Sequence, residues 1–106
     1  MAENIALTEG VYYILLALET PLHGYGIMQK TEEMSGGRVR LAAGTLYGAL
    51  SSLVKKGWIK ELPEGDSRRR EYAMTELGNQ VVREELERLE ELVQNGQQVL
   101  KQEAVK

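Results

Sequence analysis

Residues 57–74 constrain the fold of this 106-residue chain more than any other segment. Two short runs of strand-like composition, 58–62 and 68–74, enclose a Pro-Glu-Gly-Asp-Ser cluster at 63–67. Such a cluster between two short runs predicts a β-hairpin with a longer loop. The hairpin follows directly on an amphipathic helical pattern that ends at Gly57, and a hairpin in that position is the wing of a winged helix.

Two shorter helical patterns come first. One begins after Thr8, its expected N-cap, carries apolar residues at i, i+3, i+4 and i+7, and ends near Pro21. The other begins near His23, which we expect to cap or pack at the helix start, and ends at Gly36-Gly37. Residues 38–41 alternate polar and apolar side chains, so a very short strand is expected there.

The third helix, predicted at 43–56, has two faces of different chemistry. Its apolar stripe consists of Leu46, Leu50, Leu53 and Val54. The opposite face is small and polar, with a cation near its end, and consists of Gly44, Gly48, Ser51, Ser52 and Lys55. The two glycines would let the helix backbone approach another molecule closely. Tyr47 lies at the border between the faces, so the pattern leaves open whether it fills the core.

The last helix is predicted to begin after Thr75, its expected N-cap, and to carry a heptad-like seam. The seam residues are Val82, Leu86, Leu89 and Val93 at 4-3-4 spacing, with Leu100 returning to the register. Three preceding helices already supply a core, so the seam favours a homodimer over intrachain packing. Gly96 marks a close crossing, a kink or the helix end, and the sequence does not choose among them.

Together these patterns predict a mostly α fold with a small β-hairpin: a winged helix-turn-helix at 1–74 and a long C-terminal dimerisation helix at 75–106, forming one structural unit. The net charge of −3 is unevenly distributed along it. Residues 36–74 hold eight basic and four acidic side chains, whereas residues 75–106 hold four basic and seven acidic ones. The middle of the chain can therefore face a polyanion while the acidic last helix faces water.

Several functional classes are excluded or disfavoured by composition. The chain has no cysteine, and its single histidine cannot form a metal site by itself. It contains no P-loop, dinucleotide-binding or zinc motif, so we expect neither an enzyme nor a bound cofactor. The longest apolar run, 11–18, is far shorter than the roughly 18 residues that span a bilayer. The first ten residues lack a basic cluster. We therefore expect a cytoplasmic protein without a membrane partner.

Four stretches of the sequence resemble the PadR family of bacterial and archaeal transcriptional regulators. They are His23-Gly24-Tyr25-Gly26-Ile27, Gly44-Thr45-Leu46-Tyr47, Leu53-Val54-Lys55-Lys56-Gly57-Trp58-Ile59 and Arg69-Arg70-Glu71-Tyr72-Ala73-Met74-Thr75-Glu76-Leu77-Gly78. Each is weak alone, and their order and spacing carry the signal. Gly48 departs from the pattern, because relatives often have proline there. The resemblance implies a winged helix that dimerises through its first and last helices, and a repressor that binds a palindromic operator and is often released by a small effector.

The interpretation assigns DNA contacts to the third helix, the second helix and the wing. The residues are Tyr25, Thr45, Tyr47, Ser51, Lys55, Arg68, Arg69 and Arg70. Ser51 and Lys55 would lie near base edges or phosphates, and Thr45 and Tyr47 near phosphates. Tyr25 could equally fill the core. Alternating strand positions disfavour contact of all three wing arginines with DNA at once, so we expect Arg69 or Arg70 to pair with Glu61 or Glu71.

Two other functions stay open at this point. One is a protein-interaction winged helix that never touches DNA, which predicts no salt-dependent duplex binding. The other is a small-molecule sensor that binds its ligand at the dimer interface, although the seam offers no aromatic residue for stacking. The expected partners are double-stranded DNA, a second copy of the chain and an effector whose identity the sequence does not reveal.

Overall fold

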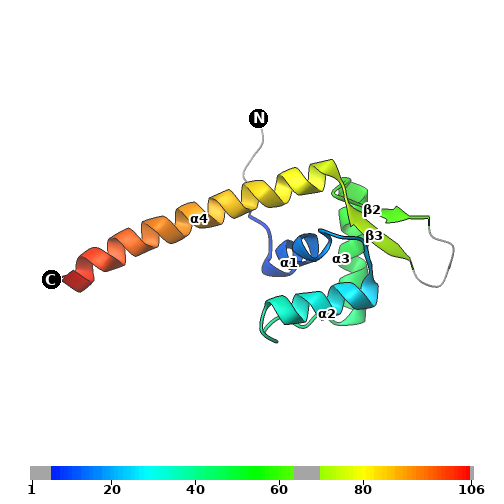
Figure 1. Cartoon of the computed structure of the whole chain (residues 1–106), viewed down its shortest axis with the longest axis horizontal. Helices are drawn as coiled ribbons and strands as arrows, with labels where there is room; N and C mark the ends of the chain where they lie inside the picture. Colours follow the sequence, from blue (N-terminus) through cyan, green and yellow to red (C-terminus); the bar gives the residue numbers. More distant parts are fainter. Residues whose placement is uncertain (1–5, 64–69, 106) are drawn as a thin grey trace.

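The computed structural model describes residues 6–63 and 70–105, with side chains described as far as residue 101. Three helices and a small sheet form a headpiece, and a fourth helix starts on the headpiece and extends far beyond it (Figure 1). The helices are α1 (Glu9–Ala17), α2 (Gly24–Met34), α3 (Ala43–Lys56) and α4 (Glu76–Val105). The predicted mostly α winged-helix architecture with a long C-terminal helix is confirmed.

The sheet has three antiparallel strands: β1 (Leu22–His23), β2 (Ile59–Leu62) and β3 (Glu71–Met74), in the order β1-β3-β2. Strands β2 and β3 form the predicted hairpin, in a register that places Ile59 opposite Met74. The expected strand at 38–41 is wrong, because those residues form a loop. The second edge of β3 is covered instead by β1, where Leu22 lies opposite Tyr72. This short strand ties the start of α2 to the wing.

The core lies where α1, α2, α3, the sheet and the first half of α4 meet. Its buried side chains include Ile14, Leu15, Leu18, Ile27, Leu46, Leu50, Leu53, Ile59, Tyr72 and Val82. Three residues of the predicted α3 stripe are among them, but Val54 is 37% exposed, so its assignment to the buried stripe is wrong. At 100° per residue, Val54 lies about 80° around the helix from Leu46, at the edge of the buried face.

The helix boundaries follow the predicted capping signals closely. The Thr8 hydroxyl accepts a hydrogen bond from the Val11 N–H at 3.1 Å, which confirms the N-cap of α1. His23 Nδ1 accepts from the Gly26 N–H at 3.4 Å, which confirms the cap of α2. α1 ends at Ala17, a turn earlier than expected. Each cap satisfies a backbone donor that has no partner within its own helix.

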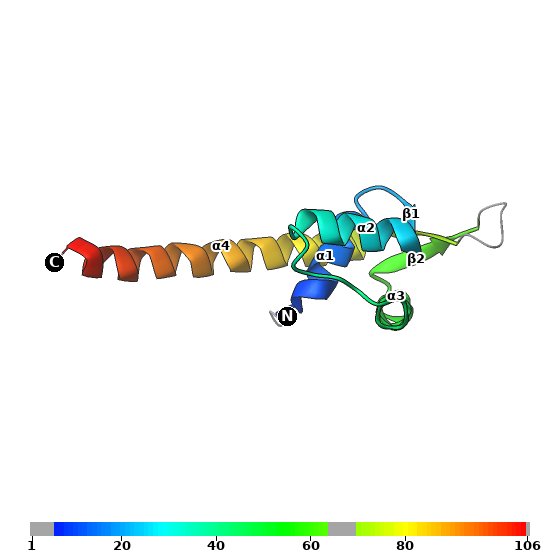
Figure 2. The same cartoon turned by 90° about the horizontal axis from the view of Figure 1, so that it is seen from below.

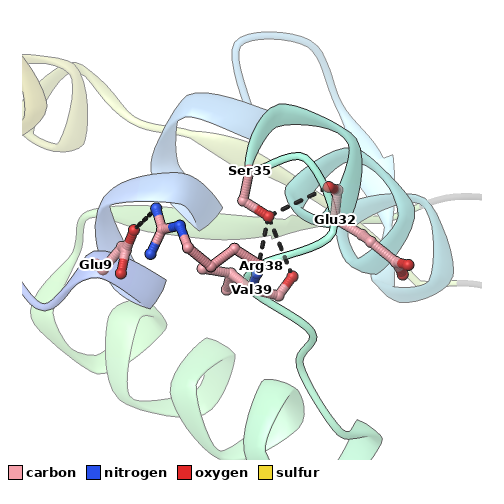
Figure 3. Close-up of polar contacts among 5 residues, drawn as sticks. All are labelled: Glu9, Glu32, Ser35, Arg38 and Val39. Carbon is pink, nitrogen blue, oxygen red and sulfur yellow. Dashed lines mark hydrogen bonds and ion pairs between the residues drawn. The ribbon is translucent and has the colours of Figure 1, made fainter.

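The loop between α2 and α3 is held by side-chain contacts rather than by strand pairing (Figure 3). The Ser35 hydroxyl accepts from the Val39 N–H at 2.9 Å and donates to the Glu32 carbonyl at 3.2 Å. Arg38 forms an ion pair with Glu9 in the first turn of α1. These contacts fix the route of the chain from the end of α2 to the start of α3.

Four residues at the junction of α3, β2 and α4 form a compact set of backbone contacts. Gly57 ends α3 in the left-handed conformation, with φ of 79°. The Thr75 N–H donates to the Trp58 carbonyl at 3.0 Å, and the Thr75 hydroxyl donates to the Gly57 carbonyl at 2.6 Å. The same hydroxyl accepts from the Gly78 N–H at 3.1 Å, which confirms Thr75 as the cap of α4. The end of α3 and the start of α4 are thereby joined directly.

A buried carboxylate anchors α4 to the segment before α1. The Glu85 side chain is only 4% exposed, and it accepts two hydrogen bonds from Arg88, at 2.8 and 2.7 Å. It also accepts from the Leu7 N–H at 3.4 Å. The hydrogen bonds from Arg88 hold the pKa of Glu85 below its ordinary value, against the opposing effect of burial. Beyond this anchor α4 runs unbroken through Gly96, which excludes a helix end at that residue.

We predict that Gly78→Ala strongly destabilises the protein. A Cβ atom at this position would lie 2.0 Å from the Trp58 carbonyl oxygen, and a backbone atom cannot move aside as a flexible side chain can. The expected loss in the free energy of unfolding is about 2 kcal/mol or more, by thermal or urea denaturation. Gly96→Ala is the matched control in the same helix, because no heavy atom lies within 4 Å of its Cβ position. Equal stability of both variants would contradict the prediction.

A second prediction concerns the pH dependence of stability. Because the folded-state pKa of Glu85 is lowered, its contribution is fully present above its unfolded pKa of about 4.3 and is lost as the pH falls through the folded value. Glu85→Gln should lower the free energy of unfolding at pH 7 by about 1–2 kcal/mol. The gap to wild type should shrink as the pH falls below about 4. Urea denaturation across this pH range measures the free energy of unfolding, and Glu87→Gln, at an exposed position, is the control. An equal loss of unfolding free energy in both variants would contradict the prediction.

Candidate nucleic-acid interface

The outward face of α3 is open and carries short side chains. Its exposed residues are Gly44, Thr45, Gly48, Ser51, Ser52 and Lys55. An ideal Cβ atom built on Gly44 or Gly48 has no heavy atom within 4 Å, so nothing in the described chain covers this face. Figure 2 looks along α3 and shows it at the outer edge of the headpiece. The face is therefore accessible to a large partner, and the predicted small, polar outer face of α3 is confirmed.

Two exposed tyrosines lie where α3 meets the start of α2. Tyr47 is 50% exposed, and its hydroxyl oxygen lies 2.2 Å from the Cβ position of Gly24, so its ring packs on that glycine. Tyr25 is 62% exposed, and its hydroxyl accepts a hydrogen bond from Gln29 Nε2 at 3.4 Å. The alternative that Tyr25 fills the core is therefore wrong, and Tyr47 is a border residue whose ring is half in solvent.

Arg70, the described member of the run of three wing arginines, already has an acidic partner. Arg70 Nη1 lies 3.2 Å from a Glu61 carboxylate oxygen, which confirms the expectation that one wing arginine pairs within the hairpin. The Tyr72 hydroxyl donates to the same carboxylate at 3.5 Å. Both Arg70 and Glu61 are exposed. The predicted contacts Arg68 and Arg69 lie outside the described residues.

The two adjacent lysines at the end of α3 lie in different surroundings. Lys56 lies over the Trp58 ring, with its Nζ atom 4.8 Å from the ring centroid. Lys55 points to the outward face and has no acidic partner within the described part of the chain. Both lysines also suit the end of a helix, where the macrodipole favours cations. Lys55 is thus the cation that α3 offers to a polyanion.

Half of α4 presents an apolar stripe to solvent. Of the predicted seam residues, Leu86, Val93 and Leu100 are exposed, the last by 65%, and Leu89 is half-buried. The assignment of Val82 to an intermolecular seam is wrong, because Val82 is 6% exposed and packs in the core of its own chain. The sequence interpretation missed Leu92 and Val99, which are also exposed. Their positions next to Val93 and Leu100 in the helical register could have indicated the wider stripe.

Other kinds of site are not found in the described part of the chain. Its acidic and histidine side chains form no group of three that could hold a metal ion. Among residues 6–63 and 70–105, no helix is both long and apolar enough to cross a membrane. The whole sequence lacks cysteine, which excludes thiolate ligands throughout.

Solved structures of transcription regulators share this fold. RosR of H. salinarum has 28% sequence identity and a TM-score of 0.72, with 97% of this chain and 98% of that chain covered. A PadR family transcription regulator from Clostridium difficile R20291 has a TM-score of 0.73, with 88% of this chain and 99% of that one covered. Its sequence identity is 23%, so this second likeness concerns the fold alone.

A curated relative and a family profile extend the comparison to sequence. An uncharacterised 37.1 kDa protein in transposon TN4556 of Streptomyces fradiae is 40% identical over 73 residues. This match covers 68% of the present chain but only 20% of the length of that relative. The profile of the PadR-like family matches residues 13–84, which include α2, α3, the sheet and the first part of α4. The chain belongs to the PadR-like family of transcriptional regulators.

Proposed function

We propose that this chain is a sequence-specific repressor that acts in the cytoplasm and binds a palindromic operator as a homodimer. The observation that carries the proposal is the outward face of α3, which is open, small and polar and ends in the exposed Lys55. Membership of a transcriptional regulator family supports double-stranded DNA as the partner of this face.

In the proposed complex, α3 enters the major groove with its outward face toward the bases. Ser51 and Lys55 then lie near base edges or phosphates, while Thr45 and Tyr47, on opposite borders of the face, contact phosphates. Tyr25 adds a phosphate contact from the first turn of α2. The exposure of all five side chains supports this assignment.

The wing supplies a second set of phosphate contacts from among Arg68, Arg69 and Arg70. The ion pair between Arg70 and Glu61 does not oppose this role, because both side chains are exposed. Exposed ion pairs contribute little to stability, typically about 0–1 kcal/mol. A phosphate can therefore replace Glu61 as the partner of Arg70 at small free-energy cost.

The stripe on α4 is the proposed dimer interface. Residues 92–101 are all exposed and project beyond the headpiece (Figure 1). This part of α4 exposes Leu92, Val93, Val99 and Leu100 together, and a contiguous exposed apolar surface favours a packing partner. A second copy of the same stripe provides one, because a two-fold interface pairs a surface with itself. Such a dimer presents two α3 helices to half-sites about 34 Å apart.

Release by a small effector completes the proposal. A groove between α1, β3 and α4 is lined by Leu16, Glu19, Met74, Asn79, Val82, Arg83 and Leu86. Its lining is apolar with a few polar groups, as in many small-molecule sites. A ligand there would contact α1 and α4 together and shift the spacing of the two α3 helices.

The first experiment measures binding of the purified protein to the DNA upstream of its own coding sequence, by mobility shift with a random duplex as competitor. If each protomer neutralises about three phosphates, log affinity should fall against log salt with a slope of about −5. Lys55→Ala removes one contact per protomer and should reduce this slope by about 2. Lys101→Ala, an exposed lysine on α4, is the control and should leave the slope unchanged. Absence of duplex binding at low salt would overturn the proposal.

The dimer is tested with variants of the α4 stripe. Val93→Glu combined with Leu100→Glu places charges on both exposed apolar positions and should give a monomer at micromolar concentration, as measured by analytical ultracentrifugation. Gln94→Glu combined with Gln98→Glu adds the same charge on the opposite face of the helix and should leave the dimer intact. A wild-type monomer, or equal dissociation of both variants, would contradict the proposed interface.

A further inference from the structure

The outward face of α3 lacks the side chains that most often read bases. Arginine or lysine on guanine, and asparagine or glutamine on adenine, make the specific bidentate contacts in the major groove. None of these residue types occurs between residues 41 and 54, so Lys55 in the last turn is the first of them in α3. The polar groups nearer the helix start are the hydroxyls of Thr45, Ser51 and Ser52, and that of Tyr47 at the border, which lies against Gly24. Short side chains reach bases only if the helix itself lies close to them.

Gly44 and Gly48 make a close approach possible. They stand one helical turn apart at the centre of the face, between Thr45 on one border and Tyr47 on the other. Nothing in the described part of the chain requires glycine at either position. Both positions are open to solvent, and neither glycine has a positive φ. Glycine inside a helix is less stable than alanine, so the fold of the single chain gains nothing from either residue.

We propose that Gly44 and Gly48 set the depth of α3 in the major groove and form a hollow that receives thymine methyl groups. The thymine C5-methyl group is the apolar feature of the major groove, and apolar protein surface recognises it. With the helix main chain this close, the Ser51 and Ser52 hydroxyls reach neighbouring base edges. The first turns of α3 contain no arginine or lysine that could contact guanine. This inference rests on the proposed DNA-binding function and names the chemistry by which that site selects its operator.

The probe is a duplex selected by the wild-type protein from a randomised library, in which each half-site thymine is replaced in turn by deoxyuridine. Loss of the methyl group at the recognised position should weaken wild-type binding about fourfold per half-site. Gly48→Ala should weaken binding to the thymine operator by at least tenfold, because the alanine methyl group fills the hollow. On the deoxyuridine operator the affinity of Gly48→Ala should be no more than about twofold below that of the wild type. The alanine methyl group there takes the place of the missing thymine methyl group. Gly44→Ala is measured in parallel.

Stability controls separate this effect from misfolding. The melting temperature of Gly48→Ala should equal or exceed that of the wild type, since its Cβ position is open. Gly10→Ala, a helical glycine in α1 whose Cβ position is in ordinary contact with Leu41 at 3.7 Å, should bind both duplexes like the wild type. Wild-type binding that is unaffected by deoxyuridine at every position, or wild-type affinity in both the Gly44→Ala and Gly48→Ala variants, would overturn the inference. Failure to bind any duplex would overturn the proposed function as well.

Discussion

The contacts between the end of α3 and the start of α4 determine how the outward face of α3 and the apolar stripe of α4 are oriented relative to each other. Thr75 bonds through its N–H and its hydroxyl to the carbonyls of Trp58 and Gly57, and Gly78 packs directly on the Trp58 carbonyl. These contacts all end on backbone carbonyls, so they leave little freedom for α4 to swing relative to α3. The helix with the exposed apolar stripe and the helix with the open polar face therefore move as one body.

Two further contacts extend this coupling to the other side of the headpiece. Glu85 of α4 binds the backbone of Leu7, immediately before α1, and Glu9 in the first turn of α1 binds Arg38 in the loop that leads to α3. The second contact lies at the surface and contributes little by itself. The first involves a nearly buried carboxylate whose loss leaves Arg88 and the Leu7 N–H without their partner. A change at α4 can thus reach α3 from both of its ends.

Local signals in the sequence predicted the features that depend on nearby residues. The caps Thr8, His23 and Thr75 and the stop at Gly57 were all predictable, because each satisfies or ends its own helix. Features that depend on distant residues were not predictable in the same way. The strand β1 exists only because β3 offers it a free edge, and two residues carry no strand pattern of their own. The assignment of Val82 to the seam failed for the same reason, since the seam pattern is continuous and only the position of the headpiece decides where burial ends.

The glycines show why a sequence alone could not separate structural from functional positions. Gly78 and Gly48 both lie in helices and look alike in the sequence, yet their surroundings are opposite. At Gly78 the chain itself occupies the space of a Cβ atom, so the residue is fixed by folding. At Gly48 the space is empty, and no backbone strain demands glycine there. A helix position that lowers stability, with no reason for it in the described part of its own chain, points to a partner outside the chain. On α3 the partner that we propose is DNA.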